Sequence, residues 1–125
     1  MAINQGDIYV INLGEPSGSE PSYTRPFVVV QNNIFNKSLI NTVIVCALTS
    51  NLKRASSPGN ILLKPREANL SAQSVINISQ LYTVDKKDLM EKIGTLSSAR
   101  ISQIMKSLDL ILKPRDIRLF HSATD

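Results

Sequence analysis

The sequence predicts a mainly β domain in which five to seven short antiparallel strands form a small barrel, followed by one C-terminal α-helix. Three observations lead to this fold class. β-Branched and aromatic stretches of strand length fill much of the chain before residue 82, a helical stripe of apolar residues appears only after residue 97, and strands do not alternate with helices. Short antiparallel strands that cover each other's edges tend to curl into a barrel. The missing βαβ alternation argues against a parallel sheet.

The first three expected strands carry the clearest signals. Residues 7–13 (DIYVINL) alternate in a way that suits a strand covered on both faces. Residues 26–32 (PFVVVQN) begin with Pro26, which is tolerated as the first residue of a strand. Residues 41–50 (NTVIVCALTS) form the third strand, and residues 14–24 predict a loop because they are rich in Gly, Pro and Ser. Two shorter strands are expected at 60–65 and 73–81.

The single helix is expected at about residues 98–112. Ser97 or Ser98 suits the cap at its start, and the Lys113–Pro114 pair stops it. Apolar residues at helical spacing predict one buried face. This stripe consists of Ile101, Ile104, Met105, Leu108 and Ile111.

Residues 85–96 (DKKDLMEKIGTL) give an ambiguous signal. Asp85 suits the cap of a helical turn, whereas residues 89–96 can equally form a strand. The chain has 125 residues, which fits one domain with one core. We place that domain at residues 1–113 and expect residues 114–125 to be a loosely held tail.

Charge and composition narrow the class of function. The net charge is +4 at pH 7, and residues 51–66 contain basic side chains but no acid. This distribution suits a solvated basic loop and a nucleic-acid footprint about equally. No apolar run reaches the ~20 residues of a membrane span, and the first residues do not read as a secretion signal. One cysteine cannot form an internal disulfide. We therefore expect a cytoplasmic location. The basic residues of 51–66 are Lys53, Arg54, Lys64 and Arg66.

Most familiar catalytic sets are missing from the sequence. The only histidine, His121, lies near the C-terminus, which is a poor position for a general base. Cys46 lies inside an apolar strand, where cysteine behaves as a small hydrophobic residue. One Cys and one His cannot build a zinc site, and no phosphate-binding glycine loop is present. The sequence therefore predicts neither a metal nor a cofactor.

A polar set at the strand ends remains as the candidate site. If strands 26–32 and 41–50 pair antiparallel, Arg25 at the start of one comes near Thr49 at the end of the other. A guanidinium beside a hydroxyl is a plausible phosphate site, because Arg binds two oxygens and Thr donates one further hydrogen bond. The alternative is a surface ion pair between Arg25 and Glu20. Spacing alone favours that alternative, since such pairs are common.

Five segments also match one known pattern in order and spacing. The chain opens with GDIYVINL, and GSEPSYTRPFVVVQNN then places Gly-Ser-Glu before an Arg-Pro pair. The third segment, VIVCALTS, ends in Thr-Ser, and SQLYTVDKKDLMEKIGTLS and SSARISQIMKSLDLIL follow it. From Gly6 to Lys113, these segments resemble the MazF/PemK toxins of bacterial toxin–antitoxin systems.

The resemblance implies a small SH3-like barrel that works as a homodimer. It also implies a sequence-specific endoribonuclease that acts on single-stranded RNA without a metal or another cofactor. The two positions that the family uses for catalysis map onto Arg25 and Thr49. The RNA-binding positions are expected at Gly18, Ser19, Glu20 and Gln80, with Ser50 and Lys53 extending the RNA groove into the basic stretch.

The chemistry implied by this resemblance explains the missing histidine and metal. RNA supplies its own nucleophile, the 2′-OH beside each phosphate, so the enzyme has to orient that group and stabilise charge. Arg25 is expected to bind the scissile phosphate, stabilise the transition state and pass a proton, while Thr49 donates a second hydrogen bond. The products would be a 2′,3′-cyclic phosphate and a 5′-OH end. The general base is not assigned, with Glu20 as a candidate.

Three positions depart from the family pattern. Ser79 stands where relatives often have an acid, Tyr82 where they often have Arg, and Pro21 where Gln is common. We expect these departures to affect the RNA target sequence more than the fold.

The expected partners are single-stranded RNA and an antitoxin whose acidic, disordered C-terminal segment competes with RNA in the same groove. Two other functions stay open. One is a binding toxin on the same fold, similar to the CcdB gyrase poisons, although the chain runs on beyond its helix where those poisons end. The other is a degenerate family member that binds RNA or antitoxin without cutting.

Overall fold

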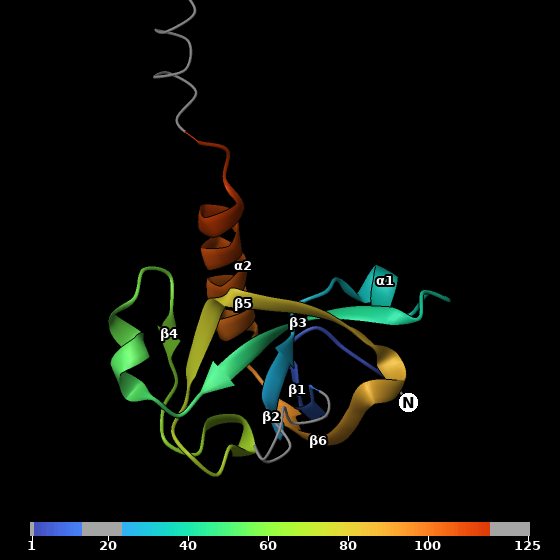
Figure 1. Ribbon diagram of the computed structural model, residues 1–125, viewed down its shortest axis with the longest axis horizontal. Helices are drawn as coiled ribbons and strands as arrows, with labels where there is room; N and C mark the ends of the chain where they lie inside the picture. Colours follow the sequence, from blue (N-terminus) through green and yellow to red (C-terminus); the bar gives the residue numbers. More distant parts are fainter. Residues whose placement is uncertain (1, 14–23, 116–125) are drawn as a thin grey trace, which may run out of the picture.

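The computed structural model describes residues 2–13 and 24–115 and confirms a mainly β fold with a C-terminal helix (Figure 1). Six antiparallel strands form one sheet in the order β4-β5-β3-β2-β1-β6, within the expected range of strand number. The sheet is open, with β4 and β6 at its two edges. The strands are β1 (Asp7–Asn12), β2 (Thr24–Val29), β3 (Thr42–Thr49), β4 (Ile61–Leu62), β5 (Val75–Asp85) and β6 (Leu89–Thr95).

Five short helical elements complete the described chain. The α-helices are α1 (Asn33–Asn36), which follows β2, and α2 (Ser98–Leu112), which follows β6. Three 3₁₀ turns, η1 (Leu52–Ser56), η2 (Glu67–Asn69) and η3 (Lys86–Asp88), lie between strands. In the described ranges, no helix combines the length and the apolar character that a membrane crossing requires.

Both faces of the central strands are buried, as the alternation in residues 7–13 predicts. Successive side chains of a strand point to opposite faces, so β1, β2 and β3 each contribute to two apolar clusters. One cluster contains Ile8, Val28, Cys46 and Leu48, and the other contains Tyr9, Ile11, Phe27, Val29, Val45 and Ala47. A one-residue slip would exchange the side chains of the two clusters, and the close packing of differently shaped side chains in each cluster opposes it.

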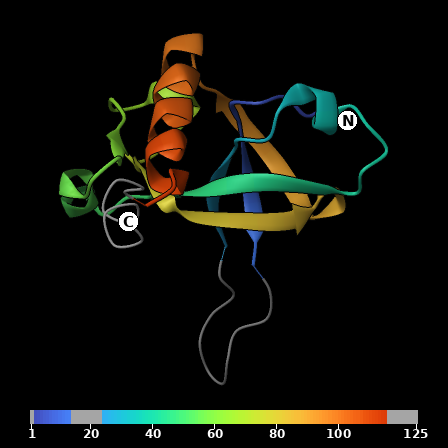
Figure 2. The same ribbon diagram turned by 90° about the horizontal axis from the view of Figure 1, so that it is seen from above.

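The helix α2 covers the first of these faces (Figure 2). Its start is as predicted: the Ser97 hydroxyl accepts a hydrogen bond from the backbone N–H of Arg100 at 3.2 Å. Ile104 is buried in the cluster, and Met105 and Leu108 pack against it. Ile111 is 42% exposed. The helix extends past the sheet, so the apolar stripe is longer than the surface it covers.

The strand β5 changes direction beside α2 (Figure 1). Its residues 81–85 pair with the first part of β3, and its residues 75 and 76 pair with the end of β3 and with β4. Between these parts, four residues of β5 lie opposite the single residue Ala47. An irregularity of this kind bends a strand and increases its twist. The bend lets one part of β5 pair with the start of β3 and the other part pair with the end of β3 and with β4. The observed strand is longer than the expected 73–81, whereas β4 is shorter than the expected 60–65.

The ambiguity at residues 85–96 resolves into both expected elements. The Asp85 carboxylate accepts a hydrogen bond from the backbone N–H of Lys87 at 3.3 Å and caps η3. The strand β6 begins directly afterwards and pairs with β1. The expectations of a cap and of a strand were therefore both correct, each for its own part of the segment.

The turn η2 links the two edge strands of the sheet, β4 and β6. It follows β4 along the chain, yet the side-chain amide of Asn69 donates a hydrogen bond to the backbone carbonyl of Ile93 in β6 at 3.0 Å. Gly94 permits this approach, since a Cβ atom there would collide with the backbone oxygen of Ala68. A side chain of any size at this position would push η2 away from β6.

We expect Gly94→Ala to destabilise the fold by about 1–3 kcal/mol, the usual cost of forcing an extra group into a filled space. Backbone atoms stand in the way, so no side chain can rotate to make room. Denaturant unfolding measures the change. Glu91→Ala, at an exposed position of the same strand, serves as the control and should stay within about 0.5 kcal/mol. Equal stability of the two variants would contradict the contact.

Candidate active site

A cleft of about 700 Å³ opens at the end of the sheet where β2 begins and β3 ends. Three parts of the chain enclose it: the start of β2 with the end of β3, the segment between η2 and β5, and the middle of β6. The polar and charged residues that line it are Thr24, Arg25, Thr49, Ser50, Asn69, Ser71, Ser74, Glu91 and Lys92.

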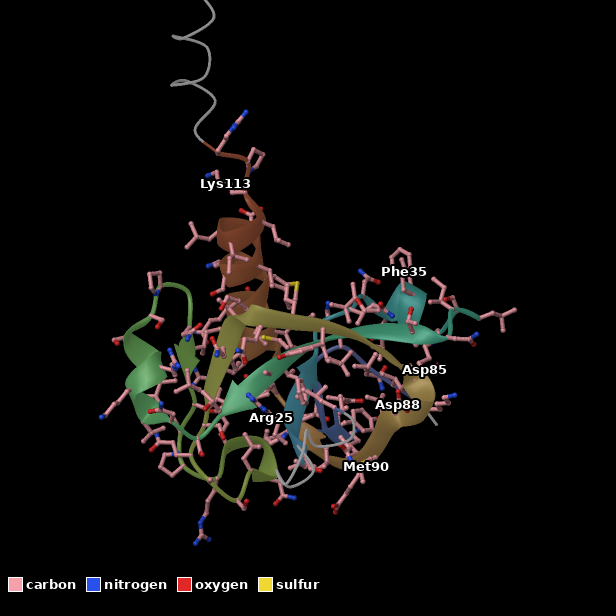
Figure 3. All side chains as sticks on the ribbon, viewed as in Figure 1. Arg25, Phe35, Asp85, Asp88, Met90 and Lys113 are labelled. Atoms are coloured by element: carbon pink, nitrogen blue, oxygen red, sulfur yellow. The ribbon has the colours of Figure 1, made fainter. Side chains whose placement is uncertain are left out.

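Arg25 is the second residue of β2 and lies beside the end of β3 (Figure 3). It pairs with Ile11 of β1. Arg25 and Phe27 are two residues apart and share a face of the strand, and the guanidinium carbon lies 6.0 Å from the centre of the Phe27 ring. A cation over an aromatic ring at this distance gains about 0.5–1 kcal/mol. The buried ring therefore helps to hold the guanidinium at the cleft.

Thr49 comes to the same cleft through the pairing of β2 with β3. These strands pair antiparallel with Phe27 opposite Ala47. Arg25 and Thr49 each lie two residues beyond that pair, and both line the cleft. The Thr49 hydroxyl oxygen accepts a hydrogen bond from the backbone N–H of Asn51 at 3.1 Å. Accepting this bond leaves the hydroxyl proton available for donation to a ligand. The pairing expected from the sequence is confirmed.

A second wall of the cleft is formed by residues 69–72, which begin with the last residue of η2. Glu67 connects this wall to α2, because its carboxylate accepts hydrogen bonds from Arg100 Nε at 2.8 Å and from Arg100 Nη2 at 3.1 Å. It also accepts one from the backbone N–H of Lys64 at 2.8 Å. These hydrogen bonds tie the turn to the first part of the helix.

The third side of the cleft belongs to β6. Lys92 forms an ion pair with Asp7, with Nζ and Oδ1 3.4 Å apart. The Asp7 side chain is buried and also accepts hydrogen bonds from the Thr95 hydroxyl and the Asn4 backbone N–H. Glu91 is exposed and is the carboxylate among the described residues that line the cleft. Sequence reasoning missed this side, since nothing in residues 85–96 indicates which residue faces a site.

Comparisons with known proteins identify the family of the chain. A model of the PemK-like, MazF-like toxins of type II toxin–antitoxin systems matches residues 4–112. The chain belongs to this toxin family.

Named relatives and solved structures agree with the family. The endoribonuclease MazF6 of Mycobacterium tuberculosis is 35% identical over 112 residues, which is 90% of this chain and 98% of the relative. The endoribonuclease MazF of Staphylococcus epidermidis is 36% identical over 110 residues, with 88% and 91% covered.

Two solved structures share the fold. An endoribonuclease in complex with its cognate antitoxin from a mycobacterial species matches with a TM-score of 0.73 at 22% identity, covering 92% of this chain and 100% of that one. The MazE–MazF structure (Form-II) of Deinococcus radiodurans matches with a TM-score of 0.74 at 18% identity, covering 90% and 96%.

The structure of this MazF-like toxin places its other predicted site residues as follows. Ser50 lines the cleft with Thr49. Lys53 is exposed on η1, three residues after Ser50, and does not line the cleft. Gln80 lies half-buried in the irregular part of β5 and is not among the residues that line the cleft. Gly18, Ser19 and Glu20 lie outside the described residues, as do Pro21 and His121.

One departure from the family pattern, Tyr82, contacts the same aromatic ring as Arg25. The ring of Tyr82 in β5 meets that of Phe27 edge-on, with centroids 5.5 Å apart and planes at 90°. Phe27 in turn lies under the Arg25 guanidinium. An aromatic residue at position 82 therefore supports the ring that positions Arg25. Ser79, the other departure within the described chain, is exposed in β5.

The remaining candidates carry no chemistry at this cleft. Cys46 is fully buried, its thiol donates a hydrogen bond to the backbone carbonyl of Asn77 at 3.1 Å, and burial raises the pKa of the thiol to about 12. It is a core residue, as its place in an apolar strand predicts. Among the residues that the structure describes, no three His, Cys, Asp or Glu side chains group in a way that would hold a metal ion.

The Glu67–Arg100 pair predicts a pH dependence of stability. The hydrogen bond from Arg100 lowers the pKa of Glu67 below its ordinary 4.5, burial opposes this, and the Lys64 backbone N–H adds to the lowering. A lowered folded-state pKa gives stability that is present above pH 4.5 and lost as pH falls through the folded value. Arg100→Met should therefore cost about 1 kcal/mol near neutral pH.

The cost should shrink toward zero in acid, because protonated Glu67 no longer attracts Arg100. Denaturant unfolding of both proteins across a series of pH values measures it. A cost that stays constant or grows as the pH falls below 4 would contradict the pairing.

Proposed function

We propose that this chain is the toxin of a toxin–antitoxin pair and acts as a metal-independent endoribonuclease that cleaves single-stranded RNA at specific sequences. The observation that carries the proposal is the meeting of Arg25 and Thr49 at one cleft of about 700 Å³. The family match supports it, and so do relatives that are named endoribonucleases. The proposed location is the cytoplasm, where mRNA is available.

The proposed reaction uses the nucleophile that RNA carries. The 2′-oxygen attacks the adjacent phosphorus, so that a bond from the 2′-oxygen to phosphorus forms and the bond from phosphorus to the 5′-oxygen breaks. The 2′-OH loses its proton, and the leaving 5′-oxygen gains one. The products are a 2′,3′-cyclic phosphate and a 5′-OH end. The reaction needs no water and no oxidant or reductant.

Arg25 and Thr49 stabilise the charge that develops during this step. The Arg25 guanidinium presents two parallel N–H groups to the non-bridging phosphate oxygens, and the Thr49 hydroxyl donates a third hydrogen bond. Donors fixed in advance stabilise the transition state without reorganisation. The contact with Phe27 and the antiparallel pairing fix Arg25 in this way.

Two carboxylates are candidates for the base that accepts the 2′-OH proton. Glu20 is the candidate from the sequence and lies outside the described residues. Glu91 lies on the β6 side of the cleft. Glu20→Gln and Glu91→Gln distinguish them, since only loss of the base removes the acidic limb of the pH–rate profile.

The proposed partners follow from the charge of the surface. Lys53, Arg54, Lys64 and Arg66 are all exposed, and cations near a site attract phosphates. An antitoxin with an acidic, disordered C-terminal segment would compete with RNA for the same groove. A relative of the same fold was solved with its cognate antitoxin, which supports such a partner. We also propose that the toxin works as a homodimer.

The proposal is tested with a long single-stranded RNA and the purified chain in excess EDTA. The expected result is a set of cuts at one short sequence, with 2′,3′-cyclic phosphate on one side and 5′-OH on the other. Cutting that starts only when a divalent cation is restored would contradict metal independence. A folded protein that makes no cuts in either condition would favour the binding-only functions, and gyrase inhibition would be tested next.

A further inference from the structure

The wall of the cleft opposite Arg25 begins in a strained segment. Arg66, Ala68 and Asn69 have backbone φ angles of 62°, 51° and 66°, although none of them is glycine. A side chain at positive φ crowds the backbone, and Ala and Arg gain nothing that offsets this. Such conformations persist only where the surroundings hold them, and they gather at functional sites.

Glu67 holds the strained segment from its centre. Its two carboxylate oxygens accept both hydrogen bonds of the Arg100 fork, and one of them also accepts from the backbone N–H of Lys64. The two side chains are 18% and 17% exposed, so water competes little with the pair. Arg100 in turn belongs to the capped first part of α2, and its Nη1 donates to the side-chain oxygen of Gln103 at 2.9 Å.

The far end of the segment is fixed by other contacts. Asn69 donates a hydrogen bond to the carbonyl of Ile93, and Leu70 is buried in the core. Backbone hydrogen bonds close the turn around Glu67 itself, since its N–H donates to the Lys64 carbonyl at 3.1 Å and its carbonyl accepts from the Leu70 N–H at 3.1 Å. The pair of Glu67 and Arg100, which we call the wall clamp, adds the side-chain contact that ties this turn to α2.

The two walls of the cleft offer different chemistry to an RNA strand. Arg25 and Thr49 suit a phosphate, which is identical at every nucleotide. Ser71 and Asn69 are exposed there, and they offer a hydroxyl, an amide oxygen and the amide N–H that the bond to Ile93 leaves over. These groups can hydrogen-bond the edges of unstacked bases. The position of residues 69–72 therefore bears on sequence selection, whereas Arg25 bears on the rate of the chemical step.

We propose that Arg100, acting through Glu67, is a positioning residue that fixes the 69–72 wall and thereby determines which RNA sequences the cleft accepts. The proposal rests on the proposed endoribonuclease function. Arg100 itself lines a separate hollow with Lys64, Glu67 and Gln103 and does not line the cleft. Its effect on RNA is therefore indirect.

The test compares Arg100→Met with Lys106→Met. Both variants remove one cation from α2 and keep a long side chain, but Lys106 is exposed and has no ion pair in the described part of the chain. The kcat and KM are measured on an RNA that contains the preferred sequence and on its single-base variants. Hydrogen exchange of the backbone amides of residues 66–72 reports the wall directly.

For Arg100→Met we expect KM to rise and discrimination between the preferred RNA and its variants to fall by about tenfold, the effect of losing one hydrogen-bonded contact. The kcat on the preferred RNA should change much less, and the 66–72 amides should exchange faster. Lys106→Met should match the wild type in every respect. Arg100→Lys, which keeps the charge and one hydrogen bond, should lie between.

Several results would overturn the proposal. The proposal is wrong if Arg100→Met has the same KM and the same discrimination between RNAs as Lys106→Met. It is also wrong if Arg100→Met changes only the melting temperature, because that is a purely structural effect. If Arg100→Met does not fold, Arg100→Lys decides, and wild-type discrimination in that variant contradicts the clamp. A wild-type protein that cuts no RNA would overturn the proposed function and this inference together. If the wild type cuts RNA and the Arg100 variants keep its discrimination, only this inference fails.

Discussion

Replacing Arg25 with alanine is expected to lower the rate of RNA cleavage by about 10²–10³-fold, the usual effect of losing a preorganised donor to a developing charge. The guanidinium is the cation that β2 brings to the cleft that Thr49 also lines, and Phe27 holds it in place. Alanine removes the guanidinium with all of its N–H donors and leaves the strand intact. Single-turnover cleavage of an RNA with the target sequence measures the chemical step separately from binding.

Two further variants give this prediction its controls. Arg25→Lys keeps the charge but not the planar fork, so its rate should lie between those of wild type and Arg25→Ala. Thr49→Val keeps the shape and strand preference of Thr49 while removing the hydroxyl, and should also slow the reaction. Melting temperatures should stay close to wild type, because Arg25 and Thr49 are both at the rim of the fold. Near-normal cleavage by a folded Arg25→Ala would refute the assignment.

Raising the salt concentration should weaken RNA binding steeply. Each phosphate contact on single-stranded nucleic acid contributes about −0.7 to the slope of log affinity against log salt. If the four basic residues of 51–66 each contact one phosphate, the slope is about −3, and affinity falls about 50-fold between 50 and 200 mM salt. Fluorescence anisotropy with an uncleavable 2′-deoxy analogue measures it.

Matched variants identify which residues produce the slope. Lys53→Ala with Arg54→Ala removes two of the four charges and should reduce the slope by about half. Lys106→Ala removes an equally exposed charge from α2 and should leave the slope unchanged. A flat salt response of the wild type would show that the basic stretch does not contact RNA phosphates.

Much of the fold could be predicted because local patterns and tertiary packing agree in it. The alternation in residues 7–13 and the cap at Ser97 each match the observed element. Asp85 could be read as a cap and the residues after 88 as a strand, and both interpretations were correct. The lengths of β4 and β5 could not be predicted, because the bend opposite Ala47 depends on packing against α2 and β4.

The candidate site could be predicted only on one of its sides. Arg25 and Thr49 follow from antiparallel pairing, a rule that depends on the sequence positions of strand ends. The opposite wall depends on positive φ angles at Arg66 and Ala68, and these residue types carry no signal for that conformation. Glu67 and Arg100 are 33 residues apart in different elements, so no spacing rule connects them.

The proposed mechanism is tested with an RNA in which a single 2′-OH, the one beside the scissile phosphate, is replaced by hydrogen. The mechanism predicts that this RNA binds as well as the unmodified RNA and is not cut, since its nucleophile is missing. The same substitution one nucleotide away should leave cleavage unchanged. Cleavage at the 2′-deoxy position would contradict attack by the 2′-oxygen and would require another nucleophile in the cleft.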